Sequence, residues 1–211
     1  MSDQPDSYVT LAGPAEAEQR IQRSRFIALA APAADVAGAQ AVVAGMRRRY
    51  HDARHVCHAW RVGGISEVSE VRQDDGEPSG TAGDPILLAI HGAGVHDAVV
   101  AVARYFGGVK LGTGGLARAY GGAAGAALSA ATTREVLLGR LFLLDHDYRL
   151  QKTVEHLLAG HRGRVEHATW DTAVHSRVWL PHSTWKAFGD ALAEATDGQV
   201  PLRPTDDQSP A

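Results

Sequence analysis

A run of glycines between a buried strand and an alanine-rich helix constrains this fold more than any other part of the sequence. Residues 104–122 read RYFGGVKLGTGGLARAYGG and hold seven of the chain's 23 glycines. The β-branched segment before them is typical of a buried strand, and the segment after them is typical of a helix. Because glycine is costly to order, this density indicates either a phosphate cradle or a crowded backbone contact.

Known phosphate motifs fit the glycine run poorly. The P-loop pattern fails because the required lysine is missing. The dinucleotide pattern is met weakly by Gly112, Gly114 and Ala117, with no acidic residue closing the next strand. Three glycines fall inside the predicted helix, the last two of the run and one beyond it: Gly121, Gly122 and Gly125. Close packing of that helix against a sheet explains these three better than a phosphate does.

A second motif, QDDGEPSGTAGDP, gathers three carboxylates in one loop: Asp74, Asp75 and Glu77. Paired carboxylates suit acid–base chemistry or Mg²⁺ binding. The alternative is two tight turns, at DG and EPSG, with the carboxylates facing Arg104 or Lys110. We favour this second interpretation, in which the loop serves structure or recognition.

The sequence gives little support for a zinc site or for a catalytic nucleophile. His51, His55, Cys57 and His58 lie close together, but strand alternation places His58 on the face opposite His55 and Cys57. The GxSxG pattern of serine hydrolases is absent. We therefore predict no metal, no cofactor and no catalytic residue.

The order of predicted elements gives two α+β domains. Residues 8–131 read as strand, strand, helix, strand, loop, helix, strand, helix, which predicts a two-layer domain. A break follows at ATTREV, and residues 136–203 have the βαββαβ order of a ferredoxin-like domain, with Ser183 as the expected N-cap of its last helix. Residues 1–7 and 204–211 are expected to be disordered tails.

Composition narrows the location and the partners. The net charge of −3 gives no global basic field for nucleic acid, although it leaves room for a local one. The single cysteine, Cys57, rules out an intrachain disulfide, and neither a secretory signal nor an apolar stretch long enough for a membrane span is present. A cytoplasmic protein without a membrane partner is expected.

Four motifs in this order and spacing resemble the IMPACT family, in particular its bacterial YigZ-like members: SRFIALAA, DARHVCHAW, DDGEPSGTAGDPIL and ARYFGGVKLGTGGLARAYGGA. The resemblance implies a ribosomal S5 domain 2-like fold for residues 8–131 and a ferredoxin-like fold for residues 136–203. It also implies a role in regulating translation, since the eukaryotic members compete for the co-activator of a starvation-responsive kinase.

The resemblance also selects the motif residues of each loop. Those of the acidic loop are Asp74, Asp75, Gly76, Glu77, Pro78, Gly80, Thr81, Ala82 and Gly83. The candidates for contact with RNA or phosphate are Arg54, Arg104, Tyr105, Gly107, Gly108, Lys110, Gly112, Thr113, Gly114, Gly115, Arg118 and Tyr120. Cations and backbone amides would meet phosphate, and Tyr105 or Tyr120 would stack on a base.

Three functions follow from these features. The favoured one is a non-enzymatic protein linked to translation that binds RNA, the ribosome or a translation or stress-response protein. The second is a Mg²⁺-dependent enzyme or binder of a phosphorylated small molecule or nucleotide, because some phosphotransferases share the S5 domain 2-like fold. The third is a protein-interaction module that uses the exposed sheet of the C-terminal domain.

Overall fold

The computed structural model describes residues 5–205, and the chain divides into two compact units. The N-terminal unit is Tyr8–Glu135, and the C-terminal unit is Val136–Ala211 together with Met1–Ser7. Most of the two expected tails, residues 1–7 and 204–211, lies outside the described residues. Where the tails are described they are bonded, because Ser7 begins a strand and the Asp6 carbonyl accepts the Leu138 N–H at 2.6 Å.

The N-terminal unit is built on a five-stranded sheet of order β2-β3-β6-β4-β5, with β1 and β7 paired separately. Its elements are β1 (Ser7–Leu11), β2 (Ala15–Ile21), β3 (Ser24–Pro32), α1 (Val36–Arg49), β4 (His55–Val62), β5 (Ser69–Gln73), α2 (Gly83–Gly92), β6 (Ala98–Tyr105), α3 (Gly112–Ala130) and β7 (Thr133–Leu137).

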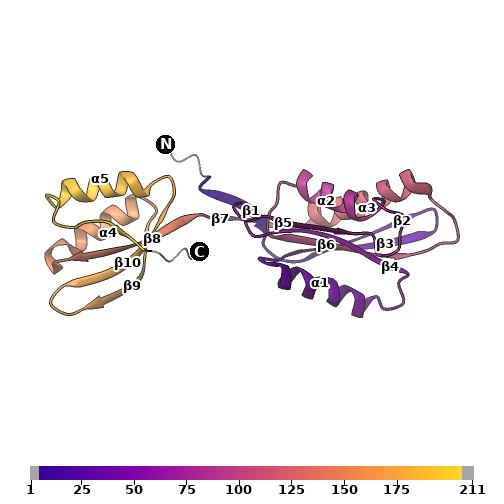
Figure 1. The fold of residues 1–211 in the computed structure, drawn as a ribbon, viewed down its shortest axis with the longest axis horizontal. Helices are drawn as coiled ribbons and strands as arrows, with labels where there is room; N and C mark the ends of the chain where they lie inside the picture. The colour runs from indigo at the N-terminus through magenta and orange to yellow at the C-terminus, as the bar shows by residue number, and fades with distance from the viewer. Residues whose placement is uncertain (1–4, 206–211) are drawn as a thin grey trace. The chain divides into compact units, whose positions relative to one another are not determined.

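Helices cover both faces of this sheet, so the predicted two layers are in fact three (Figure 1). On one face α2 and α3 pack on Phe26, Ala59 and Val102. On the other face α1 packs on Trp60 and Val99. The central strand β6 is buried on both sides, as its unbroken apolar run predicted, and this run gives no sign of how many helix layers cover it.

Residues 13–19, which the sequence predicts as a partly extended connection between two strands, lie largely in the edge strand β2, which forms a hairpin with β3. Ile21 pairs with Ser24, which leaves a two-residue turn at Gln22 and Arg23 with φ values of 42° and 68°. Positive φ at both positions is the geometry of a type I′ turn, which usually carries asparagine and glycine. The unusual turn residues hid the hairpin.

Two other segments expected to be irregular are strands. β5 lies inside the segment that was predicted to be one long loop, and β7 occupies the predicted break at ATTREV. The first helix, α1, begins at Val36, because the Asp35 side chain accepts the Gly38 N–H at 2.7 Å and caps the helix there.

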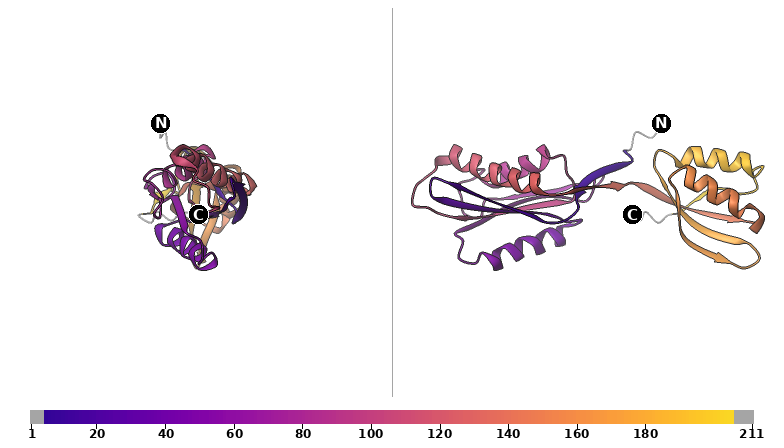
Figure 2. Two further views of the ribbon diagram at one scale, coloured as in Figure 1. Left: turned by 90° about the vertical axis from the view of Figure 1, so that its right-hand side faces the viewer. Right: turned by 180° about the vertical axis from the view of Figure 1, so that it is seen from behind.

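The C-terminal unit has the predicted chain order of strand, helix, strand, strand, helix, strand. Its elements are β8 (Gly139–His146), the 3₁₀ turn η1 (Tyr148–Leu150), α4 (Gln151–Gly160), β9 (Arg164–Trp170), β10 (Val174–Pro181), α5 (Trp185–Ala195) and β11 (Arg203–Pro204). The antiparallel sheet has the order β11-β8-β10-β9, and both helices lie on one of its faces (Figure 2). Thr184, not Ser183, is the N-cap residue of α5.

The described residues thus form a mixed α and β structure with three sheets and five α-helices. Over that same range, residues 5–205, we find no helix with the length and apolarity that a membrane span requires.

The glycines inside α3 are only partly explained by packing. A Cβ at Gly121 would lie 3.5 Å from the Cβ of Pro85 in α2, which is an ordinary contact with a helix and not with the sheet. A Cβ at Gly125 would meet nothing within 4 Å. The predicted close packing on a sheet therefore fails for Gly125.

Replacing Gly125 with alanine is expected to raise the free energy of unfolding by about 0.5–1 kcal/mol, because alanine loses less backbone entropy in a helix. Gly107→Ala is the contrasting variant. Its Cβ would lie 2.1 Å from the Arg23 carbonyl carbon, so we expect the free energy of unfolding to fall by about 1–3 kcal/mol or more. Urea denaturation of both variants measures the difference, and a destabilised Gly125→Ala protein would contradict the packing described here.

Candidate functional site

A buried carboxylate joins the two sequence motifs. The side chain of Glu77 in the acidic loop is 4% exposed, and that of Arg104 at the end of β6 is 7% exposed. The Arg104 guanidinium and the Tyr120 hydroxyl both donate to Glu77 Oε1, the hydroxyl at 2.8 Å. Of the two predicted partners of the acidic loop, Arg104 and Lys110, it is Arg104 that pairs with Glu77.

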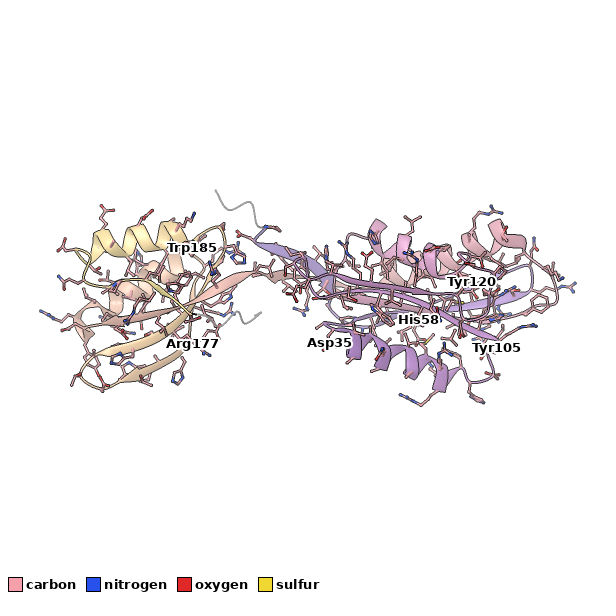
Figure 3. All side chains as sticks on the ribbon, in the orientation of Figure 1. Asp35, His58, Tyr105, Tyr120, Arg177 and Trp185 are labelled. Atoms are coloured by element: carbon pink, nitrogen blue, oxygen red, sulfur yellow. The ribbon has the colours of Figure 1, made fainter. Side chains whose placement is uncertain are left out.

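Aromatic rings flank the guanidinium of this pair, and the His55 imidazole lies beside the carboxylate, with its Nε2 3.9 Å from Glu77 Oε1. The Arg104 guanidinium lies 5.5 Å from the ring centroids of both Phe26 and Phe106. Tyr120 meets Phe26 edge to face and lies between α3 and the sheet (Figure 3). Burial, with the nearby Cys57 and Glu77, raises the pKa of Tyr120, which therefore stays a neutral hydrogen-bond donor.

Asp74 organises the backbone at the start of α2. Its carboxylate accepts the N–H groups of Gly80, Ala82 and Gly83, each at 2.9 Å. Partial burial acts to raise the pKa of Asp74, but the bonds from Gly83, Gly80 and Ala82 outweigh it and hold the pKa below the ordinary 3.8. Asp74 thus occupies the donors that would otherwise be free at this helix N-terminus.

Asp75 ties the loop to β4 and α1. It accepts the Val56 N–H and an Arg47 guanidinium N–H, at 2.7 and 2.8 Å. Burial works against the charged form of Asp75, but these bonds lower its pKa overall. With Asp74 and Glu77 also engaged, the three carboxylates that suggested Mg²⁺ are all bonded within the protein.

The other residues of the acidic loop shape its turns. Gly76 and Gly80 have φ values of 86° and 73°, which only glycine adopts readily. The Thr81 hydroxyl donates to the Pro78 carbonyl at 2.6 Å, and a Cβ at Gly83 would lie 2.6 Å from the Gln73 nitrogen. Each of these motif residues therefore has a structural role.

The histidine and cysteine cluster does not form a metal site. His55 Nδ1 lies 2.7 Å from the Asp75 carbonyl oxygen, and the Cys57 thiol donates to the Asp74 carbonyl. His58 stacks on Trp60 on the α1 side of the sheet (Figure 3). Burial raises the pKa of Cys57 to about 12, so its thiol stays protonated. Within residues 5–205, no three His, Cys, Asp or Glu side chains are arranged to hold a metal ion.

The glycine loop has a fixed base and an exposed outer part. Gly107 packs against the Arg23 backbone with no room for a side chain, and its N–H donates to Ser24 Oγ at 3.2 Å. Gly108 and Gly112, with φ values of 84° and 70°, face open space. Thr113 and Gly114 are exposed in the first turn of α3, and Gly115 is half-buried beside Leu111.

The predicted phosphate-contact residues separate into buried and exposed groups. Arg104 and Tyr120 were predicted to contact RNA, but both are buried against Glu77, so the prediction is wrong for these two residues. Tyr105 lies at the end of the sheet and donates its hydroxyl to Asp52 at 2.6 Å (Figure 3). Three predicted cations are exposed, and none has a carboxylate partner in residues 5–205: Arg54, Lys110 and Arg118.

Two exposed residues that were not predicted, Arg23 and Phe106, lie beside these cations. Arg23, in the hairpin turn, is exposed and likewise has no carboxylate partner in the described chain. The Phe106 side chain is 43% exposed. Phe106 directly follows the buried strand β6 and precedes the first pair of glycines. That position could have indicated in the sequence that its side chain is exposed. We call Arg23, Arg54, Phe106 and Lys110 the loop face.

The members of the loop face come from neighbouring segments at one end of the sheet, where β6 ends and its two partners β3 and β4 begin. The Arg23 backbone packs on Gly107, and the Arg54 N–H donates to the Arg104 carbonyl at 3.2 Å. Arg23 and Arg54 therefore flank the base of the loop that carries Phe106 and Lys110. An aromatic ring among unpaired cations suits single-stranded nucleic acid better than it suits catalysis.

Comparisons with known proteins agree with the motif resemblance. A family model described as the Impact N-terminal domain matches residues 22–128. The Escherichia coli protein "IMPACT family member YigZ" is 36% identical over 198 residues, covering 93% of this chain and 97% of that one. The Bacillus subtilis protein "IMPACT family member YvyE" is 30% identical over 197 residues, covering 93% and 90%.

A solved structure titled "Crystal structure of an hypothetical protein" has a TM-score of 0.68 and 35% sequence identity. The match covers 97% of this chain and the whole of that one.

The pH dependence of Asp74 gives a test of the acidic loop. Because its pKa is lowered on folding, Asp74 contributes stability above the ordinary pKa of 3.8, and that stability is lost as the pH falls through the folded-state pKa. We expect Asp74→Asn to lower the free energy of unfolding by about 1–2 kcal/mol at neutral pH.

The difference from wild type should then shrink in acid. Urea denaturation at neutral pH and below about pH 4 measures it. Glu67→Gln, at an exposed carboxylate of the same unit, is the matched control and should change little. A deficit that stays constant with pH would show that Asp74 does not act through its charge.

Proposed function

The chain belongs to the IMPACT family, and from that premise we propose that it is a non-enzymatic, translation-associated protein that binds RNA through the loop face. The supporting observation is the division of the two motifs. Their three carboxylates, Arg104 and Tyr120 all have hydrogen-bond partners within the protein. Arg23, Arg54 and Lys110, by contrast, are exposed near the Phe106 ring. A cationic surface with a stacking platform recognises phosphate and base together.

The two specific fold assignments belong to the same proposal. We assign the N-terminal unit to the ribosomal S5 domain 2-like fold and the C-terminal unit to the ferredoxin-like fold. The second assignment is supported by the βαββαβ order and by two helices on one face of an antiparallel sheet. Location in the cytoplasm follows from a role in translation.

The loop face supports RNA more than a phosphorylated small molecule. A Mg²⁺-dependent site would need carboxylates that are free to bind metal, whereas Asp74, Asp75 and Glu77 accept hydrogen bonds from named protein donors. Lys110 and Phe106 are held at an exposed loop. Such a surface follows an extended anionic chain more readily than it encloses a small ligand.

The proposal is tested by fluorescence anisotropy with a single-stranded RNA across a salt series. Three phosphate contacts give a slope of log K against log salt of about −2, and Lys110→Ala should reduce its magnitude by about 0.7. Arg23→Gly should reduce the slope by a similar amount. It should not destabilise the fold, because φ is 68° at that position and glycine adopts such a value readily. Phe106→Ala should weaken binding by about 1–3 kcal/mol with little change in slope.

Lys152→Ala, an exposed lysine on α4, is the matched control and should bind as wild type does. Binding without a salt slope, or unchanged by both Lys110→Ala and Phe106→Ala, would contradict the proposal. Co-sedimentation with ribosomes without any affinity for RNA would point instead to a protein partner.

A further inference from the structure

An open groove of about 660 Å³ runs between α2 and α3, both in the N-terminal unit. Pro85, Leu88 and Ala89 line it from α2, and Ala117, Arg118 and Gly121 line it from α3. Its lining is mainly apolar, and none of these residues belongs to the loop face or to the network around Glu77.

Small residues on α3 keep the groove open where the helices meet. A Cβ at Gly121 would make only an ordinary contact with Pro85, so the fold does not require glycine there. Alanine at that position would favour the helix and reduce the groove. Because the residues at the bottom of the groove are small, the backbone of another segment could approach α2 and α3 closely.

Leu88 forms a wall of the groove and is exposed to water. It is 72% exposed, the highest value among the exposed large apolar side chains of the described residues. The core-facing side of α2 is complete without it, because Ile86, Leu87 and Ile90 are buried. Leu88 therefore does nothing for the packing of this unit, and covering it would be favourable.

The uncompensated charge at the groove is positive. Asp84 on one wall is neutralised by Arg72 at 2.8 Å. Arg118 on the other wall is exposed and has no carboxylate partner among residues 5–205. Its guanidinium lies 3.5 Å from the Cβ position of Gly114, toward the N-terminus of α3, where the helix dipole adds to the positive potential.

We infer that this groove docks an amphipathic helix of a partner protein, with apolar side chains over the small floor and against Leu88 and a carboxylate at Arg118. A groove between two helices fits a third helix presented by its apolar face. The unpaired Arg118 selects the acidic version of such a helix. This inference does not depend on RNA binding by the loop face.

The test uses the full chain and a displayed library of amphipathic helical peptides. Their apolar stripe is fixed, and the flanking positions are randomised among Glu, Lys and Gln. The wild-type chain should enrich peptides with Glu beside the stripe. Synthetic copies of these should bind Leu88→Ser about tenfold or more weakly in an anisotropy titration. On Arg118→Glu the enrichment should switch from Glu to Lys.

Leu143→Ser, at an exposed leucine of the C-terminal unit, is the matched control and should bind as wild type does. The inference would be overturned if no peptide were enriched, if Lys were preferred by the wild type, or if Leu88→Ser kept full affinity. It would also be overturned if Leu88→Ser weakened RNA binding as much as peptide binding, since the groove would then be part of an RNA surface. Self-association in sedimentation velocity that depends on Leu88 would identify a second copy as the occupant instead.

Discussion

The buried ion pair between Glu77 and Arg104 is the interaction on which the N-terminal unit depends. A carboxylate that is almost fully removed from water stays charged only when it is paired and further hydrogen-bonded. Glu77 meets this requirement through Arg104 and Tyr120, which come from β6 and α3. Removing one partner of such a pair leaves an uncompensated buried charge and costs about 3–5 kcal/mol. The acidic loop, the central strand and the helix after the glycine loop are therefore stabilised together.

This arrangement separates framework from surface within the two motifs. Asp74 and Asp75 fix the start of α2 and the edge of β4, and Gly107 allows the glycine loop to rest on the hairpin turn. With the base of the loop held, Phe106 and Lys110 are presented on a preorganised segment. Preorganisation lowers the entropy lost on binding, so a small exposed face can serve an extended ligand. In the proposed RNA binding, the Glu77–Arg104 pair would act through the position it gives to Phe106 and Lys110, because the pair itself is buried.

The sequence predicted the parts of this structure that depend on local patterns. The buried strand β6, the helix α3 and a cationic partner for the acidic loop followed from periodicity and turn residues. The hairpin of β2 and β3 was not predicted, because its turn is Gln22–Arg23, whose positive φ values are imposed by strand pairing and not by residue preference. The burial of Arg104 and Tyr120 was also missed, because it arises from contacts between residues distant in sequence. The sequence identifies a charged residue, but it does not show whether that side chain is buried or exposed.

Hydrogen exchange of backbone amides tests the role of the buried pair most directly. In Glu77→Gln, the amides of Gly80, Ala82 and Gly83 and those of residues 104–107 should lose protection together, although the two segments belong to different loops. Tyr120→Phe, which removes one hydrogen bond, should cause a smaller loss in the same two segments. Glu67→Gln, at an exposed carboxylate of the same unit, should change neither segment. Loss of protection in the acidic loop alone, with residues 104–107 unchanged, would contradict the account.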